Sequence, residues 1–228
     1  MSSIDKTKSE DLTLQAFKMI KNLLFSNEMN PKMRLNAREL AKTLEMSPTP
    51  VTQALKLLHY QGIIRHIPNR GYFMEANTPA MVKDIFNLRL ALETANVRAL
   101  ADRIDQGEWQ SLERALELHK DALETHSPKR ILLADMTFHI TLARLSNGDA
   151  GERLMRTLFE MLYLKTRRSV LYTRPKKQFI DHHRQILDLL RAQKMDNAVA
   201  AISRHITQVR DAVLREMDRQ EEDLNFDW

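Results

Sequence analysis

The stretch Ser47–Leu58, SPTPVTQALKLL, fixes the start of a helix and so decides how the first third of the chain folds. Proline at a first helical position loses no needed N–H, and its φ already suits a helix. The serine ahead of it is predicted to cap the helix. The apolar residues lie on one helical face, and the opposite face carries polar side chains: Thr49, Thr52, Gln53 and Lys56. Such a helix fits a DNA groove, although an ordinary amphipathic surface helix has the same pattern.

Two further helices are predicted before this stretch. Apolar residues recur at helical spacing from about residue 10 to residue 27, and Asn30-Pro31 ends that segment. Asn36 is then placed to cap a short helix over residues 37–44, with Glu39 at its third position as in a capping box. Only Glu45 and Met46 separate this helix from Ser47. Two short helices joined so closely indicate a helix-turn-helix.

A β-hairpin is predicted directly after the third helix. Residues 63–67 and 72–74 favour strands, and Pro68-Asn69-Arg70-Gly71 between them is a turn sequence. A hairpin in this place is a wing, with Asn69 and Arg70 at its tip. Residues 1–77 hold 11 Lys and Arg against 7 Asp and Glu, a net charge of +4, whereas the remaining residues carry only +1. The ordered set of elements and the basic charge together favour binding to double-stranded DNA.

Composition narrows the class of protein. The 228 residues are 43% hydrophobic and 29% charged, with five glycines and no cysteine. Such a chain is predicted to be mainly α-helical, without a disulfide framework or a thiolate metal site. No apolar run approaches the roughly 20 residues of a membrane span, and the first residues lack the apolar core of a signal peptide. We therefore expect a cytoplasmic protein with no membrane partner.

The rest of the chain is predicted to be helical. Six helices are expected over residues 78–104, 107–126, 128–147, 150–173, 176–193 and 195–222. Short breaks such as Asp105-Gln106-Gly107 and Ser146-Asn147-Gly148-Asp149 separate them. Connections this short indicate an antiparallel bundle of six to seven helices.

Four polar residues are predicted to face the interior of this bundle. Asp135 and His139 fall within one apolar stripe, four residues apart, and His183 and His205 fall within the stripes of two later helices. Burying each without a partner costs on the order of 1–3 kcal/mol. A divalent ion, zinc, nickel or another first-row ion, would satisfy all four, with zinc or nickel expected first. Satisfied core histidines, or histidines that bind an organic ligand directly, are the alternatives.

The first part of the chain resembles the GntR family of bacterial transcription regulators. The resemblance rests on Pro31–Leu35, Ala37–Ala41, Ser47–Leu55 and Gly62–Phe73, which match the family's motifs without a gap. It implies that Arg38 and Thr49 contact DNA and that Gly71 lets the wing approach the minor groove. The predicted DNA-binding set is Arg38, Ser47, Thr49, Thr52, Gln53, Lys56, Asn69, Arg70 and Gly71.

Two positions depart from that family's pattern. The family usually has arginine where this chain has Pro48 and Thr52. Arginine reads guanine bidentately, whereas threonine makes single hydrogen bonds or touches a thymine methyl, and glutamine reads adenine. We therefore expect an operator that depends less on guanine, with Gln53 and Lys56 making more of the contacts.

The second part resembles the FCD ligand-binding domain of the FadR subfamily. Its motifs match Arg89–Glu93, Asp135 with Phe138-His139, His183–Leu187 and, in altered form, Ala198–His205. The resemblance implies that the aspartate and the three histidines hold a metal ion whose coordination a small carboxylate completes. Arg89, Arg167 and Arg168 are candidates to bind that carboxylate, since guanidinium pairs with it bidentately; for Arg89, a structural ion pair with Glu93 is an equal alternative.

The resulting expectation is a dimeric, metabolite-responsive regulator, with a winged helix-turn-helix over residues 1–76 and a helical effector-binding and dimerisation domain over residues 77–228. It would act as a repressor on a near-palindromic operator. The alternative from another class is a metal-dependent hydrolase, because three histidines and an aspartate with an open coordination position could activate water.

Overall fold

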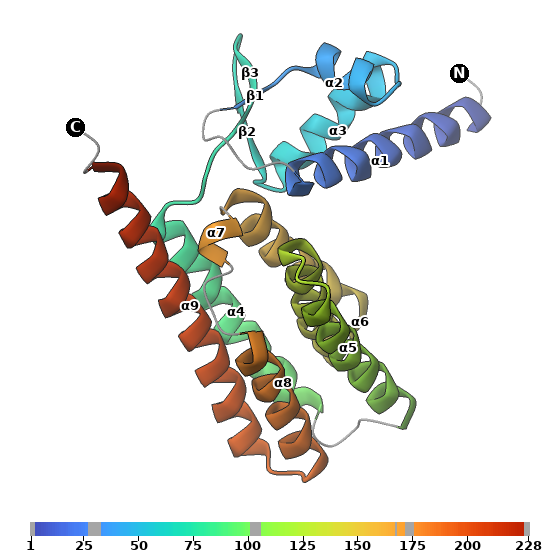
Figure 1. Cartoon of the computed structure of the whole chain (residues 1–228). Coiled ribbons are helices and arrows are strands. Elements are labelled where there is room, and N and C mark those ends of the chain that lie inside the picture. Colours follow the sequence, from blue (N-terminus) through green and yellow to red (C-terminus); the bar gives the residue numbers. More distant parts are fainter. Residues whose placement is uncertain (1–2, 27–32, 101–105, 167, 172–175, 226–228) are drawn as a thin grey trace. The chain divides into compact units, whose positions relative to one another are not determined.

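The computed structural model describes residues 3–26, 33–100, 106–166, 168–171 and 176–225, and it divides into two compact units (Figure 1). The first unit comprises Met1–Asn77 together with Tyr163–Arg167. The second comprises Thr78–Leu162 and Arg168–Trp228. The described residues are mainly helical, and their strands all lie in the first unit, so the predicted fold class is confirmed.

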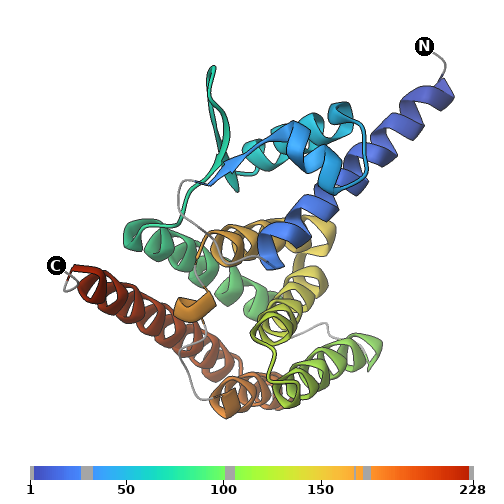
Figure 2. The same cartoon turned by 45° about the horizontal axis from the view of Figure 1, so that its top comes forward.

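The first unit consists of helices and a small antiparallel sheet. Its elements are α1 (Ser3–Ser26), β1 (Arg34–Leu35), α2 (Ala37–Thr43), α3 (Pro48–Tyr60), β2 (Ile64–Ile67) and β3 (Gly71–Met74). Helix α3 packs against both α1 and α2, and the strands lie in the order β1-β3-β2. Figure 2 shows α2 and α3 beside the sheet, with the β2–β3 hairpin projecting from it as a wing.

Helix α1 begins at Ser3, about seven residues before the predicted start. The helix packs against α3, and its buried residues include Ala16, Ile20 and Leu24, which recur every four residues. Leu12, which the periodicity placed in the same stripe, is 39% exposed. The helix continues beyond its apolar stripe because Ser3–Glu10 contains neither glycine nor proline to end it.

The start of α3 lies where it was predicted, but Ser47 does not cap it. Ser47 is the N-cap residue by its backbone angles, and its side chain makes no capping hydrogen bond. A capping oxygen accepts from the N–H of the second or third helical residue. Here the third residue is Pro50, which has no N–H, so one of the two usual donors is missing. The Ser47 hydroxyl is therefore not used to start the helix.

The sheet contains a strand that the sequence analysis missed. Arg34 pairs with Phe73 and Leu35 with Tyr72, so β1 adds an edge to the predicted hairpin. Two residues are too few for a periodic pattern, and their strand character comes only from pairing with β3. The wing turn itself needs a positive φ at two positions, which Asn69 (φ 61°) and Gly71 (φ 96°) supply.

The second unit is a helical bundle. Its elements are α4 (Pro79–Leu100), α5 (Gln106–Glu124), α6 (Pro128–Lys165, whose last three residues group with the first unit), α7 (Arg168–Leu171), α8 (Lys176–Arg191) and α9 (Met195–Asn225). Helix α9 packs along α4 and α8, and α8 also packs against α5. None of the described helices combines the length and the hydropathy needed to cross a lipid bilayer.

Helix α6 ends eight residues before the predicted end at residue 173. The carbonyl of Lys165 accepts a hydrogen bond from the backbone N–H of Asn77 (2.8 Å), where a continuing helix would bond it to residue 169. The Asn77 side chain also donates to the hydroxyl of Thr166 (3.0 Å). Contacts from a distant part of the sequence therefore end this helix. The predicted end of the helix over 78–104 lies outside the described residues.

The predicted break near Gly148 is present as a kink within α6. Asn147 and Gly148 have non-helical angles, and Gly148 combines φ 60° with ψ −148°, a conformation that suits glycine. The Asn147 amide donates to Asn96 Oδ1 (2.7 Å), and the Ser146 hydroxyl donates to the Asn96 carbonyl (3.0 Å). Asn96 of α4 thus holds the kink in place.

Gly151 allows the two halves of α6 to approach each other at this kink. A Cβ at residue 151 would lie 2.4 Å from the backbone oxygen of Ala143, and a backbone atom cannot move away cheaply. We expect Gly151→Ala to lower the free energy of unfolding by about 1–3 kcal/mol, as overpacking typically does. Chemical denaturation measures this, with Ala150→Gly as a control that changes the neighbouring position in the opposite sense. Equal stability of wild type and Gly151→Ala would contradict the close approach.

Candidate metal centre and nucleic-acid interface

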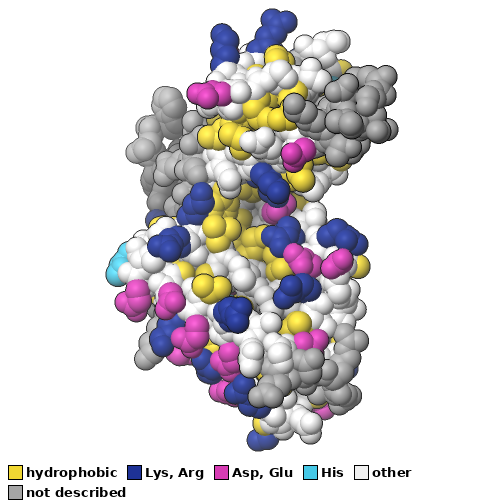
Figure 3. Space-filling model, turned by 90° about the vertical axis from the view of Figure 1, so that its right-hand side faces the viewer, with side chains coloured by type: hydrophobic (Ala, Val, Ile, Leu, Met, Phe, Trp, Pro, Cys, Tyr) yellow, Lys and Arg dark blue, Asp and Glu magenta, His cyan; other side chains and the backbone are white. Residues whose placement is uncertain are grey.

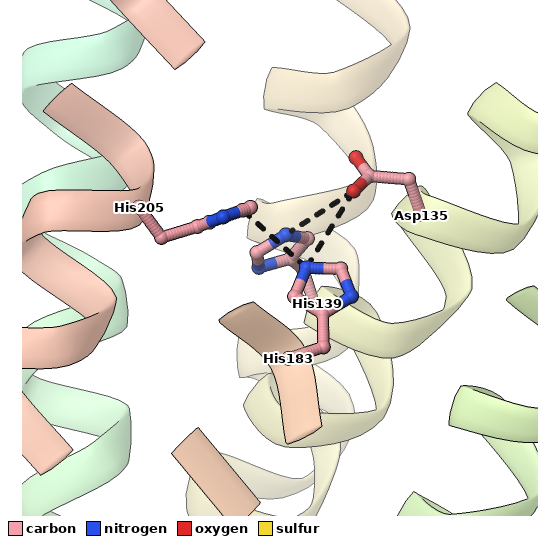
Figure 4. A group of neighbouring side chains, drawn as sticks. All are labelled: Asp135, His139, His183 and His205. Atoms are coloured by element: carbon pink, nitrogen blue, oxygen red, sulfur yellow. Dashed lines mark hydrogen bonds and ion pairs between the residues drawn. The ribbon is translucent and has the colours of Figure 1, made fainter. Parts of the chain in front are cut away.

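Four side chains from three helices meet inside the second unit. Asp135 and His139 lie on α6, His183 on α8 and His205 on α9, and Figure 4 shows them converging. One ligand atom from each lies within 4.8 Å of the others. The three histidines are at most 2% exposed, and the Asp135 side chain is 13% exposed. All four residues that the sequence placed on inward faces are thus brought together.

The distances between these atoms suit a metal ion. His183 Nε2 lies 3.6 Å from Asp135 Oδ1 and 3.3 Å from His205 Nε2, and His139 Nε2 lies 3.7 Å from Asp135 Oδ1. Nitrogen and oxygen ligands about 2.0–2.2 Å from a tetrahedral ion lie roughly 3.3–3.6 Å apart. These three distances are therefore close to those between the ligands of one first-row ion, and all four ligand atoms lie within 4.8 Å of one another.

In each histidine of the group, Nε2 points towards the centre and Nδ1 contacts another residue. His139 Nδ1 bonds to Glu93 Oε2 (2.5 Å). His183 Nδ1 lies 3.2 Å from His119 Nδ1, and His205 Nδ1 lies 3.4 Å from His182 Nδ1. Partners at the second ring nitrogen are the usual means of orienting a metal-bound imidazole.

Polar atoms at the centre lack the partners that burial requires. His139 Nε2 is buried without a hydrogen-bond partner among the described residues. When Nδ1 of His183 and of His205 carries the proton, their Nε2 lone pairs face each other across 3.3 Å. Lone pairs that converge beside a carboxylate need a cation between them. The residues present therefore fit a divalent ion.

Burial and neighbouring charges shift the titration of these groups. Burial opposes ionisation of Asp135, but the neighbouring His139, His183 and His119 hold its pKa well below the usual range. Burial and the neighbouring histidines lower the pKa of His183 and of His205 well below that of free histidine. For His139 burial is outweighed by Glu93 and Asp135, which raise its pKa. The group thus offers an ionised carboxylate and two neutral imidazoles, the forms that bind metals.

Arg89 lies behind this centre in a buried ion pair. Its Nε donates to Glu93 Oε1 (2.8 Å), and its guanidinium lies 4.1 Å from the ring centre of Phe159. The charges of His139 and Arg89 overcome the effect of burial and lower the pKa of Glu93 to about 2. The ion pair with Glu93 that the sequence left open is therefore present. Arg167 and the side chain of Arg168 lie outside the described residues.

Sequence reasoning missed three residues that contact the metal group. The sequence pattern offered Glu93 only as a partner of Arg89, and it places His182 one position from the inward face of its helix. His119 was not singled out, although it follows the buried Leu112 and Leu116 at helical spacing and is itself fully buried. The apolar periodicity of α5 was the signal that could have found it.

The predicted DNA-binding residues of the helix-turn-helix lie largely on the surface. Ser47, Thr49, Gln53 and Lys56 on or beside α3 are exposed, and so is Arg38 on α2. Thr52 is half-buried, and its hydroxyl donates to the Pro48 carbonyl (2.8 Å). The hydroxyl proton of Thr52 is therefore used within the helix, which leaves the residue an acceptor oxygen and a methyl group.

The wing presents basic residues that differ in their partners. Arg65 is paired with Glu75 (2.9 Å), whereas Arg70 at the tip is exposed and lies 6.0 Å from the ring centre of Phe73. The guanidinium of exposed Arg34 lies beside Gly71, 3.7 Å from where a Cβ would stand. Arg34 was not predicted as a DNA contact, although it falls within the quoted family motif. Arg34 and Arg70 are the basic side chains that the sheet offers to a polyanion.

One face of the second unit carries a mixture of basic and acidic side chains. On the side where α5 and α6 lie, basic and acidic side chains alternate over its surface with hydrophobic ones between them (Figure 3). Exposed pairs such as Arg156 with Glu152 (2.6 Å) contribute to this mixture. That face therefore carries no field of one sign that would attract DNA.

Comparison with protein families matches both parts of the chain. The FCD domain matches residues 84–208, which is more than half of the chain. The family described as bacterial regulatory proteins, gntR family, matches residues 12–74. The chain belongs to the GntR family and carries an FCD domain. As a GntR-family transcription regulator it binds DNA.

Relatives described as transcription regulators agree with this assignment. The chain is 30% identical to the Nta operon transcriptional regulator of Aminobacter aminovorans over 194 residues, which cover 83% of this chain and 88% of that protein. It is 23% identical to the HTH-type transcriptional repressor RspR of Escherichia coli K12, over 96% of this chain and 94% of that one. The relatives of this regulator are not enzymes, so the hydrolase alternative is set aside.

Solved structures support the fold of this GntR regulator. A putative transcriptional regulator GntR from Rhodococcus sp. RHA1 matches with a TM-score of 0.74 at 20% identity, over 89% of this chain and 97% of that one. E. coli McbR/YncC matches with the same TM-score at 22% identity, over 90% and 98%. At such identities the likeness concerns the fold.

Proposed function

We propose that this GntR regulator is a dimeric, cytoplasmic repressor whose affinity for a near-palindromic operator is set by a small organic acid bound at a metal centre. The observation that carries the proposal is the buried convergence of Asp135, His139, His183 and His205 in the FCD domain. We take residues 1–76 as the DNA-binding domain and residues 77–228 as the effector-binding and dimerisation domain.

The donor set favours zinc or nickel. Three imidazole nitrogens and one carboxylate oxygen suit borderline first-row ions, whereas magnesium and calcium prefer oxygen ligands alone. A bound ion would supply an open coordination position to which a ligand oxygen can bind. Asp135, His139, His183 and His205 would hold it.

Charge favours an anionic effector at this position. Asp135 and Glu93 are ionised and Arg89 is cationic, so these three buried groups and a bound divalent ion sum to +1. A monocarboxylate would neutralise the loaded site, and a buried site with no net charge avoids a large desolvation penalty. Arg89, Arg167 and Arg168 remain the proposed partners of that carboxylate. Glu93 links Arg89 to His139 of the metal group.

Operator contact is assigned to the exposed polar residues of the winged helix. Arg38, Ser47, Thr49, Gln53, Lys56 and Thr52 would face the DNA from the helix-turn-helix, and Asn69, Arg70 and Gly71 from the wing. Because its hydroxyl proton bonds to Pro48, Thr52 is suited to touch a thymine methyl or accept from a base amine. We expect an operator less rich in guanine than the family's usual one, read mainly by Gln53 and Lys56.

Binding-site selection followed by affinity measurement tests this function. The full chain, purified without an affinity tag, is used to select DNA sites, and its affinity for them is then measured in chelator and with zinc, nickel and a panel of small carboxylates. A coupling of about 1–3 kcal/mol predicts a 5- to 150-fold change with the effector. Arg38→Ala should weaken binding over a similar range, whereas Arg156→Ala on α6, with the same loss of charge, should not.

Three outcomes would contradict parts of the proposal. Selection of the family's guanine-rich operator would overturn the assigned role of Thr52. Affinity that is indifferent to metal and to every carboxylate would overturn the effector mechanism. A monomer on the operator, measured by light scattering, would overturn the dimer.

A further inference from the structure

Two kinds of side chain contact Nδ1 of the three inward histidines: a carboxylate and other histidines. His139 is oriented by a carboxylate, Glu93, which Arg89 supports in turn. His183 and His205 are instead oriented by two other histidines, His119 and His182. Five of the eight histidines of the chain therefore lie in this one cluster.

Proton positions in these contacts follow from the chemistry of imidazole. Where two Nδ1 atoms face each other, only one can carry the proton that joins them. A histidine that binds an ion through Nε2 keeps its proton on Nδ1. His119 and His182 must then accept at Nδ1, and an imidazole that accepts a hydrogen bond is neutral.

We propose that His119 and His182 are positioning residues that hold His183 and His205 in the tautomer needed for metal binding while adding no charge to the site. The inference rests on the metal centre proposed above. A carboxylate at either place would orient the ligand equally well, but it would cancel the remaining +1 of the loaded site. Two neutral partners thus preserve the attraction of the site for an anionic ligand.

His119 and His182 differ in burial, which gives two independent tests. His119 is fully buried between α5 and α8, with its ring centre 5.2 Å from that of His183. His182 is only partly buried beside α9, with its ring centre 5.6 Å from that of His205. A substitution at His182 therefore tests the idea even where one at His119 prevents folding.

Metal affinity of the full chain is the first measurement. Zn²⁺ binding is measured by competition with a chelator for the wild type and for His182→Leu, His182→Gln, His119→Leu and His119→Gln. Loss of a partner of this kind typically weakens metal binding about 10- to 100-fold. We expect that loss in the leucine variants and recovery to within a few-fold in the glutamine variants, whose amide oxygen can accept the same hydrogen bond. His126→Gln, an exposed histidine on the α5–α6 turn, is the matched control.

Two further measurements separate positioning from simple packing. Long-range ¹H–¹⁵N correlation spectra of the Zn²⁺-loaded wild type should show that Nδ1 of His119 and of His182 carries no proton and that Nε2 of each is protonated. His182→Glu should bind Zn²⁺ at least as well as the wild type, while acetate binds its Co²⁺-loaded form about tenfold more weakly, as followed by visible absorption.

The outcomes distinguish this inference from the proposed function. A wild type that binds no Zn²⁺ would overturn the metal centre itself. A wild type that binds Zn²⁺, with leucine variants at both positions unchanged in affinity or with protonated Nδ1 atoms on His119 and His182, would overturn only the positioning role. Unchanged acetate binding in His182→Glu would overturn the role of neutrality.

Discussion

Glu93→Gln should lower the free energy of unfolding by about 3–5 kcal/mol. The substitution leaves the guanidinium of Arg89 buried without its carboxylate, and breaking a buried ion pair from one side carries a cost of this size. Glu93 also accepts from His139, so the variant weakens the support of the metal group as well. Chemical denaturation in the presence of a chelator, followed by circular dichroism, measures the change without a contribution from bound metal.

The matched control is an exposed pair on α6. Glu152 and Arg156 are also four residues apart and bonded at 2.6 Å, but their side chains are 29% and 46% exposed. Glu152→Gln should change stability by less than about 1 kcal/mol, because water screens an exposed pair. The double variant Arg89→Met/Glu93→Gln should recover part of the loss, since it removes the unpaired charge. Equal effects of Glu93→Gln and Glu152→Gln would mean that burial does not govern the Arg89–Glu93 pair.

Loss of one inward ligand should abolish the stabilisation that metal gives to this regulator. A ligand that binds only the folded state adds about 2.7 kcal/mol when its concentration is 100 times the dissociation constant. We expect Zn²⁺ to raise the thermal midpoint of the wild type and to leave that of His183→Ala unchanged. Removing an orienting partner weakens metal binding about 10- to 100-fold, so removing the ligand itself should exceed about 100-fold.

Elemental analysis of protein purified without a tag gives the direct measurement. The wild type should retain close to one zinc or nickel per chain, and His183→Ala and Asp135→Asn should retain far less. His126→Ala serves as the control because His126 is exposed and its Nδ1 bonds to the backbone carbonyl of Glu124, away from the metal group. Equal metal content in wild type and His183→Ala would remove the basis for the proposed effector site.

Local patterns in the sequence were sufficient for most of the elements. The double proline at Pro48 and Pro50 set the start of α3, and helical spacing identified inward faces on α6, α8 and α9. Asn36 caps α2 as predicted, since its side chain accepts from the N–H of Arg38 (2.9 Å). These features depend on residues within one or two helical turns of each other, and they can therefore be recognised from the sequence alone.

Contacts between distant residues decided the rest. The end of α6 at Lys165 depends on a hydrogen bond from Asn77, and strand β1 exists only through its pairing with β3. Each depends on which group competes for a backbone donor or acceptor, and helical periodicity carries no information about such competition.

The candidate metal centre likewise depends partly on local sequence patterns and partly on contacts between distant residues. The sequence determined which faces carry Asp135, His139, His183 and His205, because a helix places residues three and four apart on one side. Only the packing of α5, α8 and α9 placed His119 and His182 against the second nitrogen of two of these histidines. Orientation of an imidazole depends on what touches both its nitrogens, and those neighbours come from helices far apart in the chain.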